Sequence, residues 1–216
     1  MNAYNQTMRT VTARQVDRPG FVPPTDWSAV GARGHAVQFY PTDGHLLHLL
    51  SRFIGTALVT GDVGIVIATT GHRDGLAKRL KARGLDVTVA RRQGRYFALD
   101  AAATLRKFTR EGRLDRALFR EVIGGMVSKL AAQDGRRQIS AFGEMVALLW
   151  AAGKPESAIQ LEEMWNELAQ ELDFCLCCAY PISGFGNRHA APFMKICAQH
   201  SHVFTVAQAT GLANAV

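Results

Sequence analysis

Short apolar runs alternate with segments of helical periodicity from His35 onward. Apolar, β-prone runs predict strands over residues 35–40, 63–68, 87–90, 95–99, 138–142, 174–180 and 203–205. Between these runs, apolar residues recur at helical spacing and predict helices over 46–57, 73–83, 101–109, 116–132, 146–152, 155–172 and 192–200. This alternation is typical of a three-layer α/β fold, in which helices cover both faces of a mostly parallel sheet.

The pattern also predicts how the chain is divided. Prolines and glycines interrupt residues 1–33, which have no hydrophobic period, so we expect a flexible leader there. A single domain is expected over 34–206, followed by a loose tail over 207–216. At the first strand-to-helix turn, Thr42 or Asp43 is expected to cap the helix.

In a parallel sheet of this kind, ligands bind beyond the carboxyl ends of the strands. The segments that follow predicted strands are 40–44, 69–72, 142–145 and 180–184. Among them, Glu144 stands between a β-branched strand and an apolar helix, where a half-buried carboxylate needs a donor. It either stabilises a helix N-terminus or anchors a ligand.

The first turn occupies the place of a phosphate-binding loop but lacks its chemistry. A phosphate loop needs several glycines, a lysine and a hydroxyl residue. The turn from Tyr40 to His45 has one glycine and no lysine, Pro41 removes a backbone donor, and Asp43 would repel a phosphate. The sequence therefore argues against nucleotide hydrolysis at this turn.

The spacing of the histidines and cysteines does not match a metal-binding motif, so no metal site is expected. Cys175 and Cys178 lie three apart on a predicted strand, so their side chains point to opposite faces. The pairs His45/His48 and His200/His202 have no third ligand nearby in the sequence. A redox role for the segment 175–178 stays open.

Three more polar residues have two interpretations each. His35 opens the first strand and is either a hydrogen-bonded edge residue or a ligand or phosphoacceptor side chain. Glu162 and Asn166 lie four apart and share a helix face, which is more often solvated but could line a groove.

Composition restricts the class of protein. The chain has 216 residues, 48% of them hydrophobic, and a formal net charge of +7. No apolar run is long enough to span a membrane, and residues 1–20 have no apolar core of a signal peptide, so a cytoplasmic location is expected. Basic residues crowd 78–95 without interleaved aromatics, which argues against nucleic-acid binding, and acidic residues crowd 156–173. The helices predicted over 73–83 and 155–172 carry opposite charges, and we expect both to form interfaces.

An ordered series of short motifs resembles the MEDS domain, the methanogen/methylotroph, DcmR-type sensory domain. The motifs that carry the resemblance are His35-x-x-x-Phe39-Tyr40, Gly61-Asp62, Leu99-Asp100, Gly112-Arg113-Leu114-Asp115, Gly143-Glu144-Met145 and Glu162-x-x-x-Asn166. They extend over about residues 35–205. The resemblance implies a RecA/KaiC-like fold with a degraded phosphate loop, and a non-catalytic sensor of small organic compounds.

We therefore expect a regulatory domain that binds a small organic molecule without a cofactor. The sequence contains no kinase or helix-turn-helix segment, so output is expected through a signalling partner, such as a histidine kinase or a transcription regulator, or through a homo-oligomer. A ligand-free scaffold and a residual nucleotide hydrolase or phosphoacceptor are the alternatives. The expected ligand-binding residues are His35, Phe39, Tyr40, Asp43, Thr69, Phe142, Glu144, Trp150 and Tyr180.

Overall fold

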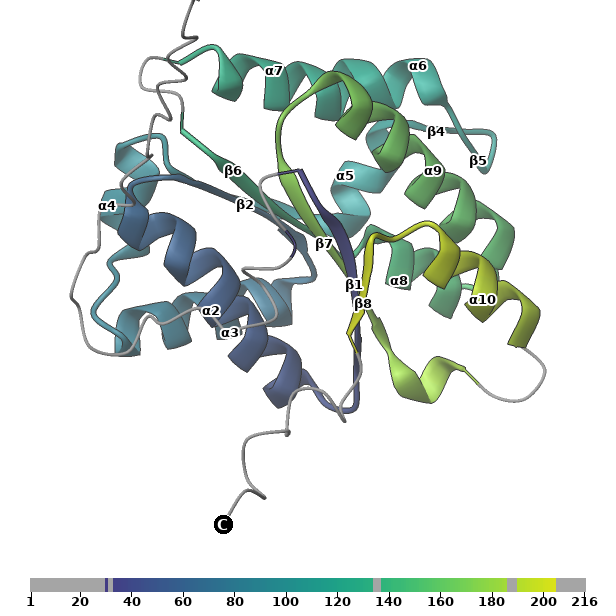
Figure 1. The fold of residues 1–216 in the computed structure, drawn as a ribbon, viewed down its shortest axis with the longest axis horizontal. Coiled ribbons are helices and arrows are strands. Elements are labelled where there is room, and N and C mark those ends of the chain that lie inside the picture. Colours follow the sequence, from purple (N-terminus) through teal and green to yellow (C-terminus); the bar gives the residue numbers. More distant parts are fainter. Residues whose placement is uncertain (1–29, 31–32, 134–136, 186–189, 205–216) are drawn as a thin grey trace, which may run out of the picture.

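A six-stranded sheet forms the centre of the structure (Figure 1). The computed structural model describes residues 30, 33–133, 137–185 and 190–204. The strands are β1 (His35–Tyr40), β2 (Val63–Ala68), β3 (Tyr96–Asp100), β6 (Ile139–Gly143), β7 (Cys175–Pro181) and β8 (His202–Phe204). Their spatial order is β3-β2-β6-β7-β1-β8, and every neighbouring pair is parallel. All six strands therefore end at one edge of the sheet, the carboxyl edge, and begin at the other, the amino edge.

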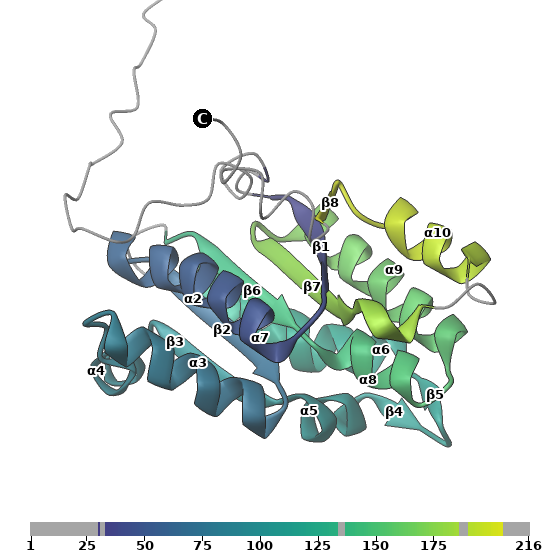
Figure 2. The ribbon, with the colours of Figure 1, turned by 90° about the horizontal axis from the view of Figure 1, so that it is seen from below.

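Helices cover both faces of this sheet (Figure 2). One face packs against α2 (Asp43–Thr60), α3 (Thr70–Ala82) and α4 (Val87–Arg92). The other face packs against α5 (Ala101–Lys107), α6 (Arg116–Phe119), the π-helical segment η1 (Arg120–Gly124), α7 (Gly125–Ala131), α8 (Met145–Ala151), α9 (Pro155–Glu171) and α10 (Ala190–Ala198). The predicted α/β fold with a mostly parallel sheet flanked by helices is confirmed.

The turn between β1 and α2 follows the sequence signals closely. Thr42 has extended backbone angles, and its side-chain oxygen accepts a hydrogen bond from the His45 N–H, so Thr42 is the helix cap. The helix ends at Gly61, whose φ of 88° is the left-handed conformation that glycine adopts without steric cost. Thr42 and Gly61 therefore set the two ends of α2, which connects β1 to β2.

One predicted element is wrong, and another ends earlier than predicted. Residues 87–90 form the start of α4 instead of a strand, because the Asp86 carboxylate caps the helix by accepting from the Thr88 and Val89 N–H groups. The helix predicted over 101–109 ends at Lys107. It is followed by a two-stranded hairpin of β4 (Thr109–Arg110) and β5 (Arg113–Leu114), whose turn residues Glu111 and Gly112 both have positive φ.

The predicted leader and tail lie almost wholly outside the described residues. Within the leader, Val30 is buried against the α2 side of the sheet, and Arg33 forms an ion pair of 2.6 Å with Asp173. Among the described helices, none combines the length and the apolar character that a membrane span requires.

Removing the α2 cap tests this boundary. We expect Thr42→Ala to lower the free energy of unfolding by about 1 kcal/mol, because an N–H group of the first turn loses its acceptor. Thr42→Ser keeps the hydroxyl oxygen that accepts this hydrogen bond. Its free energy of unfolding should therefore stay within about a few tenths of a kcal/mol of the wild-type value. Urea unfolding of the three proteins measures this, and equal stability of all three would contradict the assigned cap.

Candidate functional site at the carboxyl edge

Glu144 is the centre of a polar cluster at the carboxyl edge. It stands between β6 and α8 and is 4% exposed. One carboxylate oxygen accepts a hydrogen bond of 2.8 Å from the Thr69 N–H, and the other lies 2.7 Å from Nδ1 of His72. The carboxylate therefore joins the β6–α8 turn to the start of α3. The hydrogen-bond donor that the buried Glu144 carboxylate needs is therefore supplied by the Thr69 N–H.

His72 connects this buried carboxylate to the first turn of α2. Its Nδ1 faces Glu144, and its Nε2 lies 3.4 Å from a carboxylate oxygen of Asp43. The hydrogen bond with Glu144 raises the pKa of His72, burial lowers it, and the charges of Glu144 and Asp43 raise it further, so that the net direction is upward. The imidazolium form is thus favoured between two carboxylates.

Tyr40 and Asp43 complete the cluster from the β1–α2 side. The Tyr40 ring meets the His72 ring edge to face, with centroids 6.3 Å apart. Burial, together with the charges of Glu144 and Asp43, raises the pKa of the Tyr40 hydroxyl, which stays protonated. The side chain of Asp43 is 78% exposed, so it is the most accessible member of the cluster.

The chemistry of this cluster suits a hydrogen-bond donor or a cation and opposes an anion. Two carboxylates face one imidazolium, and Pro41 and Asp43 stand where a phosphate loop would need donors and positive charge. Four predicted ligand residues meet here: Tyr40, Asp43, Thr69 and Glu144.

Three of the predicted ligand-binding residues lie on the α9 side of the sheet, opposite the side chain of Tyr40. Phe39, Trp150 and Tyr180 pack into one aromatic group with Phe185 and Phe193, at ring-centroid distances between 4.3 and 6.1 Å. Successive residues of a strand point to opposite faces, so Phe39 cannot share a wall with Tyr40. These aromatic side chains form core rather than lining the polar cluster.

Phe142 is fully buried on the Tyr40 side of the sheet, one residue before Gly143. It is part of the hydrophobic core on that side and exposes no surface to a ligand.

His35 lies at the amino end of β1, away from the carboxyl edge. Its Nδ1 is 2.8 Å from the Asn166 amide oxygen, and its Nε2 is 3.3 Å from Glu162 and 3.4 Å from Cys178. Its side chain is 6% exposed. The solvated-face interpretation of Glu162 is wrong, because this carboxylate is fully buried and accepts from the Tyr180 hydroxyl at 2.8 Å.

The cysteines divide between the two faces as the strand period predicts. Cys175 and Cys177 belong to the α2 side of the core, and Cys178 belongs to the α9 side. Cys175 and Cys178 therefore do not converge on one point. All four cysteines are free thiols.

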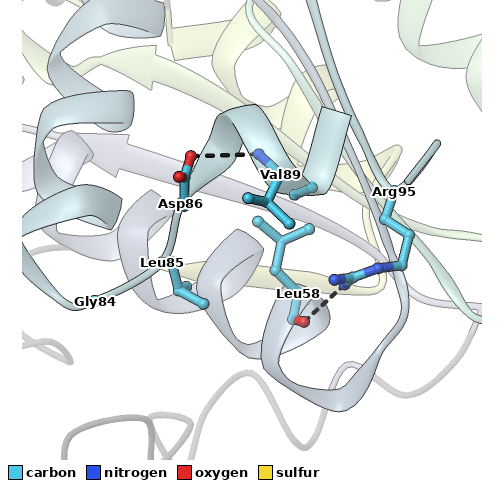
Figure 3. Close-up of a pocket in the computed structure, with 7 residues that line it drawn as sticks. Leu58, Gly84, Leu85, Asp86, Val89 and Arg95 are labelled. Carbon is cyan, nitrogen blue, oxygen red and sulfur yellow. Dashed lines mark hydrogen bonds between the residues drawn. The ribbon is translucent and has the colours of Figure 1, made fainter. Parts of the chain in front are cut away.

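A pocket of about 200 Å³ opens at the amino edge, between the end of α2, the start of α4 and the residue before β3 (Figure 3). Its two polar side chains are engaged: Asp86 caps α4, and Arg95 donates to the Leu58 carbonyl. None of the predicted ligand residues lines it. The lining residues are Leu58, Gly84, Leu85, Asp86, Val89, Ala90 and Arg95.

His72 lies in the segment 69–72, which follows a predicted strand, but it carries no local sequence signal of its own. A histidine in the first turn of a helix is not by itself a signal. Only the parallel pairing of β2 with β6 brings this turn beside Glu144.

Substitution of Glu144 by glutamine tests the cluster. We expect Glu144→Gln to lower the free energy of unfolding by about 1–3 kcal/mol, because a buried charged hydrogen bond is lost. It should also lower the pKa of His72, which NMR titration of its ring protons measures. Glu163→Gln on the exposed side of α9 is the matched control. An unchanged His72 titration in Glu144→Gln would contradict the assignment.

The raised pKa of His72 predicts a pH dependence of stability. The stabilisation from this residue is fully present below the unfolded pKa of about 6.5 and is lost as the pH rises through the higher folded value. Urea unfolding of the wild type and of His72→Gln across this range measures it. The difference in stability between the two proteins should shrink as the pH rises, and a constant difference would contradict the ion pair.

Comparison with known proteins identifies the family of this chain. No curated protein matches the chain. Residues 34–196, about three quarters of the sequence, match the family described as "MEDS: MEthanogen/methylotroph, DcmR Sensory domain". The match includes β1, from which Tyr40 comes, and the turns that carry Asp43, Thr69, His72 and Glu144. The chain therefore belongs to the MEDS family of sensory domains.

Proposed function

We propose that this MEDS domain is a non-catalytic sensor that binds a small organic molecule at the carboxyl edge and signals through a protein partner. The observation that carries the proposal is the Glu144 cluster, in which one buried carboxylate connects the β6–α8 turn to the β2–α3 turn directly and to the β1–α2 turn through His72. A ligand that competes for this carboxylate would act on three turns at once. The family membership supports a sensory role.

The ligand class follows from the charges of the cluster. Glu144 and Asp43 are acceptors, so the ligand is a neutral or cationic compound with N–H or O–H donors. Binding would replace His72 at the Glu144 oxygen and free the first turn of α3. A ligand shifts a conformational equilibrium only through such a difference in contacts between two states.

The strand order places β1 between β7 and β8, with the β1–α2 turn where a phosphate loop would lie. This arrangement supports a RecA/KaiC-like scaffold whose phosphate site has been lost. The absence of lysine from the turn and the carboxylate of Asp43 oppose nucleotide binding. Burial of His35 opposes its phosphorylation by a partner kinase.

The surface that contacts the partner is best supplied by α3 and α4. We place the protein in the cytoplasm. Their exposed basic side chains are Lys78, Arg79, Lys81, Arg91 and Arg92. This surface suits a protein partner with an acidic face.

The acidic helix α9 is a weaker candidate for the interface than the sequence indicated. Its Glu163 and Glu167 pair with Arg116, and Glu171 pairs with Arg120. These charges are already partly balanced within the chain.

Calorimetric titration tests the ligand. A panel of small amines and alcohols is titrated into the full chain beside ATP with Mg²⁺. We expect at least one organic compound to bind, with at least tenfold weaker binding to Glu144→Gln and unchanged binding to Glu163→Gln. ATP should neither bind nor be hydrolysed.

Two results would overturn this proposal. ATP hydrolysis that Glu144→Gln abolishes would establish a nucleotide hydrolase. Indifference to every compound, together with a partner bound equally by the wild type and Glu144→Gln, would establish a scaffold without a ligand.

A further inference from the structure

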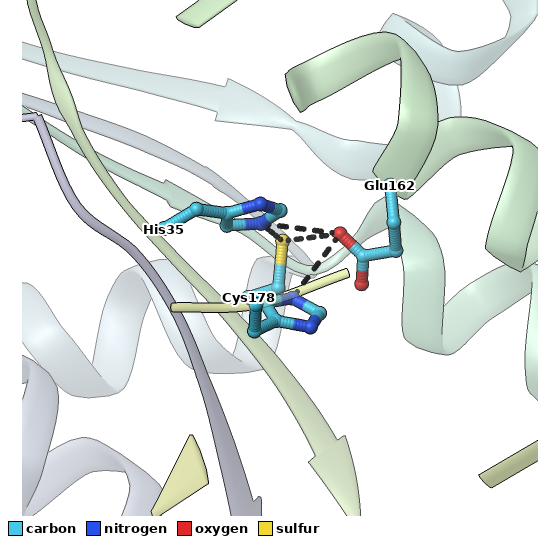
Figure 4. Close-up of side chains that lie close together, drawn as sticks. His35, Glu162 and Cys178 are labelled. Carbon is cyan, nitrogen blue, oxygen red and sulfur yellow. Dashed lines mark hydrogen bonds and ion pairs between the residues drawn. The ribbon is translucent and has the colours of Figure 1, made fainter. Parts of the chain in front are cut away.

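Four potential metal ligands converge in the interior, on the α9 side of the sheet. His35, Glu162, Cys178 and His200 each place one ligand atom within 4.8 Å of the others. They come from the start of β1, from α9, from β7 and from the turn between α10 and β8. Figure 4 shows the side chains of His35 and Cys178 directed toward the Glu162 carboxylate.

Three of the distances between these atoms match the edges of a tetrahedral zinc site, and the distance from Glu162 to Cys178 is slightly shorter. The Glu162 Oε2 atom lies 3.3 Å from His35 Nε2, 3.5 Å from His200 Nε2 and 3.1 Å from Cys178 Sγ. His35 Nε2 and Cys178 Sγ are 3.4 Å apart. Zinc bonds of about 2.0 Å to nitrogen or oxygen and 2.3 Å to sulfur place neighbouring ligand atoms of a tetrahedron roughly 3.3–3.6 Å apart.

The outer nitrogens of both histidines are held by neighbouring oxygens. Nδ1 of His200 is 2.7 Å from the Ile196 carbonyl oxygen, which can only accept, so this nitrogen carries the proton. Nδ1 of His35 faces the Asn166 amide oxygen, since the Asn166 NH₂ group donates to Gln199. In both rings Nε2 therefore faces the cluster while Nδ1 is held by an oxygen, which is the orientation that ligating histidines require.

His200 provides a second, independent sign of a missing ligand. Its side chain is fully buried, yet among the described residues its Nε2 has no hydrogen-bonding partner. A buried, unsatisfied polar atom is costly and calls for an unseen occupant. The atom lies 3.5 Å from the Glu162 Oε2 oxygen, so either a proton or a metal ion must lie between the two atoms.

The charges also balance around a divalent ion. A thiolate and a carboxylate carry two negative charges, and two neutral imidazoles add none. The Cys178 Sγ atom donates a hydrogen bond to Glu162 Oε2 at 3.1 Å, so the residue is a thiol in the absence of a metal ion. Coordination would release that proton and form the metal–sulfur bond.

We propose that His35, Glu162, Cys178 and His200 form a closed, four-ligand site for a divalent transition metal, with zinc as the ion that this mixture of nitrogen, oxygen and sulfur ligands fits. Four protein ligands leave no open position, so the ion is structural. It ties the α10–β8 segment to β1, β7 and α9. Tyr180, which donates to the second Glu162 oxygen at 2.8 Å, orients the carboxylate.

Metal analysis of the tag-free full chain tests the site. We expect elemental analysis to find about one zinc per chain after expression with zinc. After removal of the metal by a chelator, Co²⁺ should bind with one equivalent and give the intense visible bands of tetrahedral cobalt, with a thiolate-to-cobalt charge-transfer band. Wild-type protein that takes up neither ion at micromolar concentration would overturn the proposal, leaving protons alone to balance the cluster.

Two variants assign the ligands. Cys178→Ser should remove the charge-transfer band and weaken Co²⁺ binding at least tenfold, whereas Cys197→Ser on α10 should leave both unchanged. His200→Asn should weaken binding and retain the charge-transfer band, with far-UV circular dichroism checking that each variant is folded. A band that persists in Cys178→Ser would place the ion elsewhere and also overturn the proposal.

Discussion

A carboxylate with no access to water is the constraint on which the α9 side of this domain depends. Glu162 is 0% exposed, and an ionised group at such a depth must be surrounded by donors or cations. Burial raises its pKa, and the nearby His200 and His35 side chains lower it, so that the net direction is downward. The fold therefore needs β1, β7, α9 and the end of α10 in register around one oxygen atom.

Glu144 repeats this arrangement on the other side of the sheet, with a different consequence. Its partners are a backbone N–H and one histidine, and that histidine also reaches the exposed Asp43. The Glu162 cluster is closed by the core, whereas the Glu144 cluster ends at solvent. The first is suited to holding the domain together, and the second to responding to something outside it.

The sequence predicted most of the fold because parallel strands buried on both faces are unmistakable apolar runs. It failed at 87–90, where Val-Thr-Val-Ala is β-prone but the Asp86 cap and the packing of Ala90 select a helix. The hairpin at 109–114 has strands of only two residues each and leaves no periodic trace. Tertiary context decides such short segments.

The sites were predictable in part. The carboxyl-edge rule found Tyr40, Asp43, Thr69 and Glu144, but it also collected Phe39 and Tyr180, because it does not distinguish the two faces of a strand. His35 and His200 come together because β8 lies beside β1, and no local pattern in the sequence contains that neighbourhood.

The position of β1 has a consequence for biosynthesis. This strand lies between β7 and β8, so its first partners, Leu176 and His202, leave the ribosome long after it does. At about 5–20 residues per second, β1 waits roughly 7–28 s with both hydrogen-bonding edges unpaired. The six-stranded sheet can therefore be completed only when nearly the whole domain has been translated.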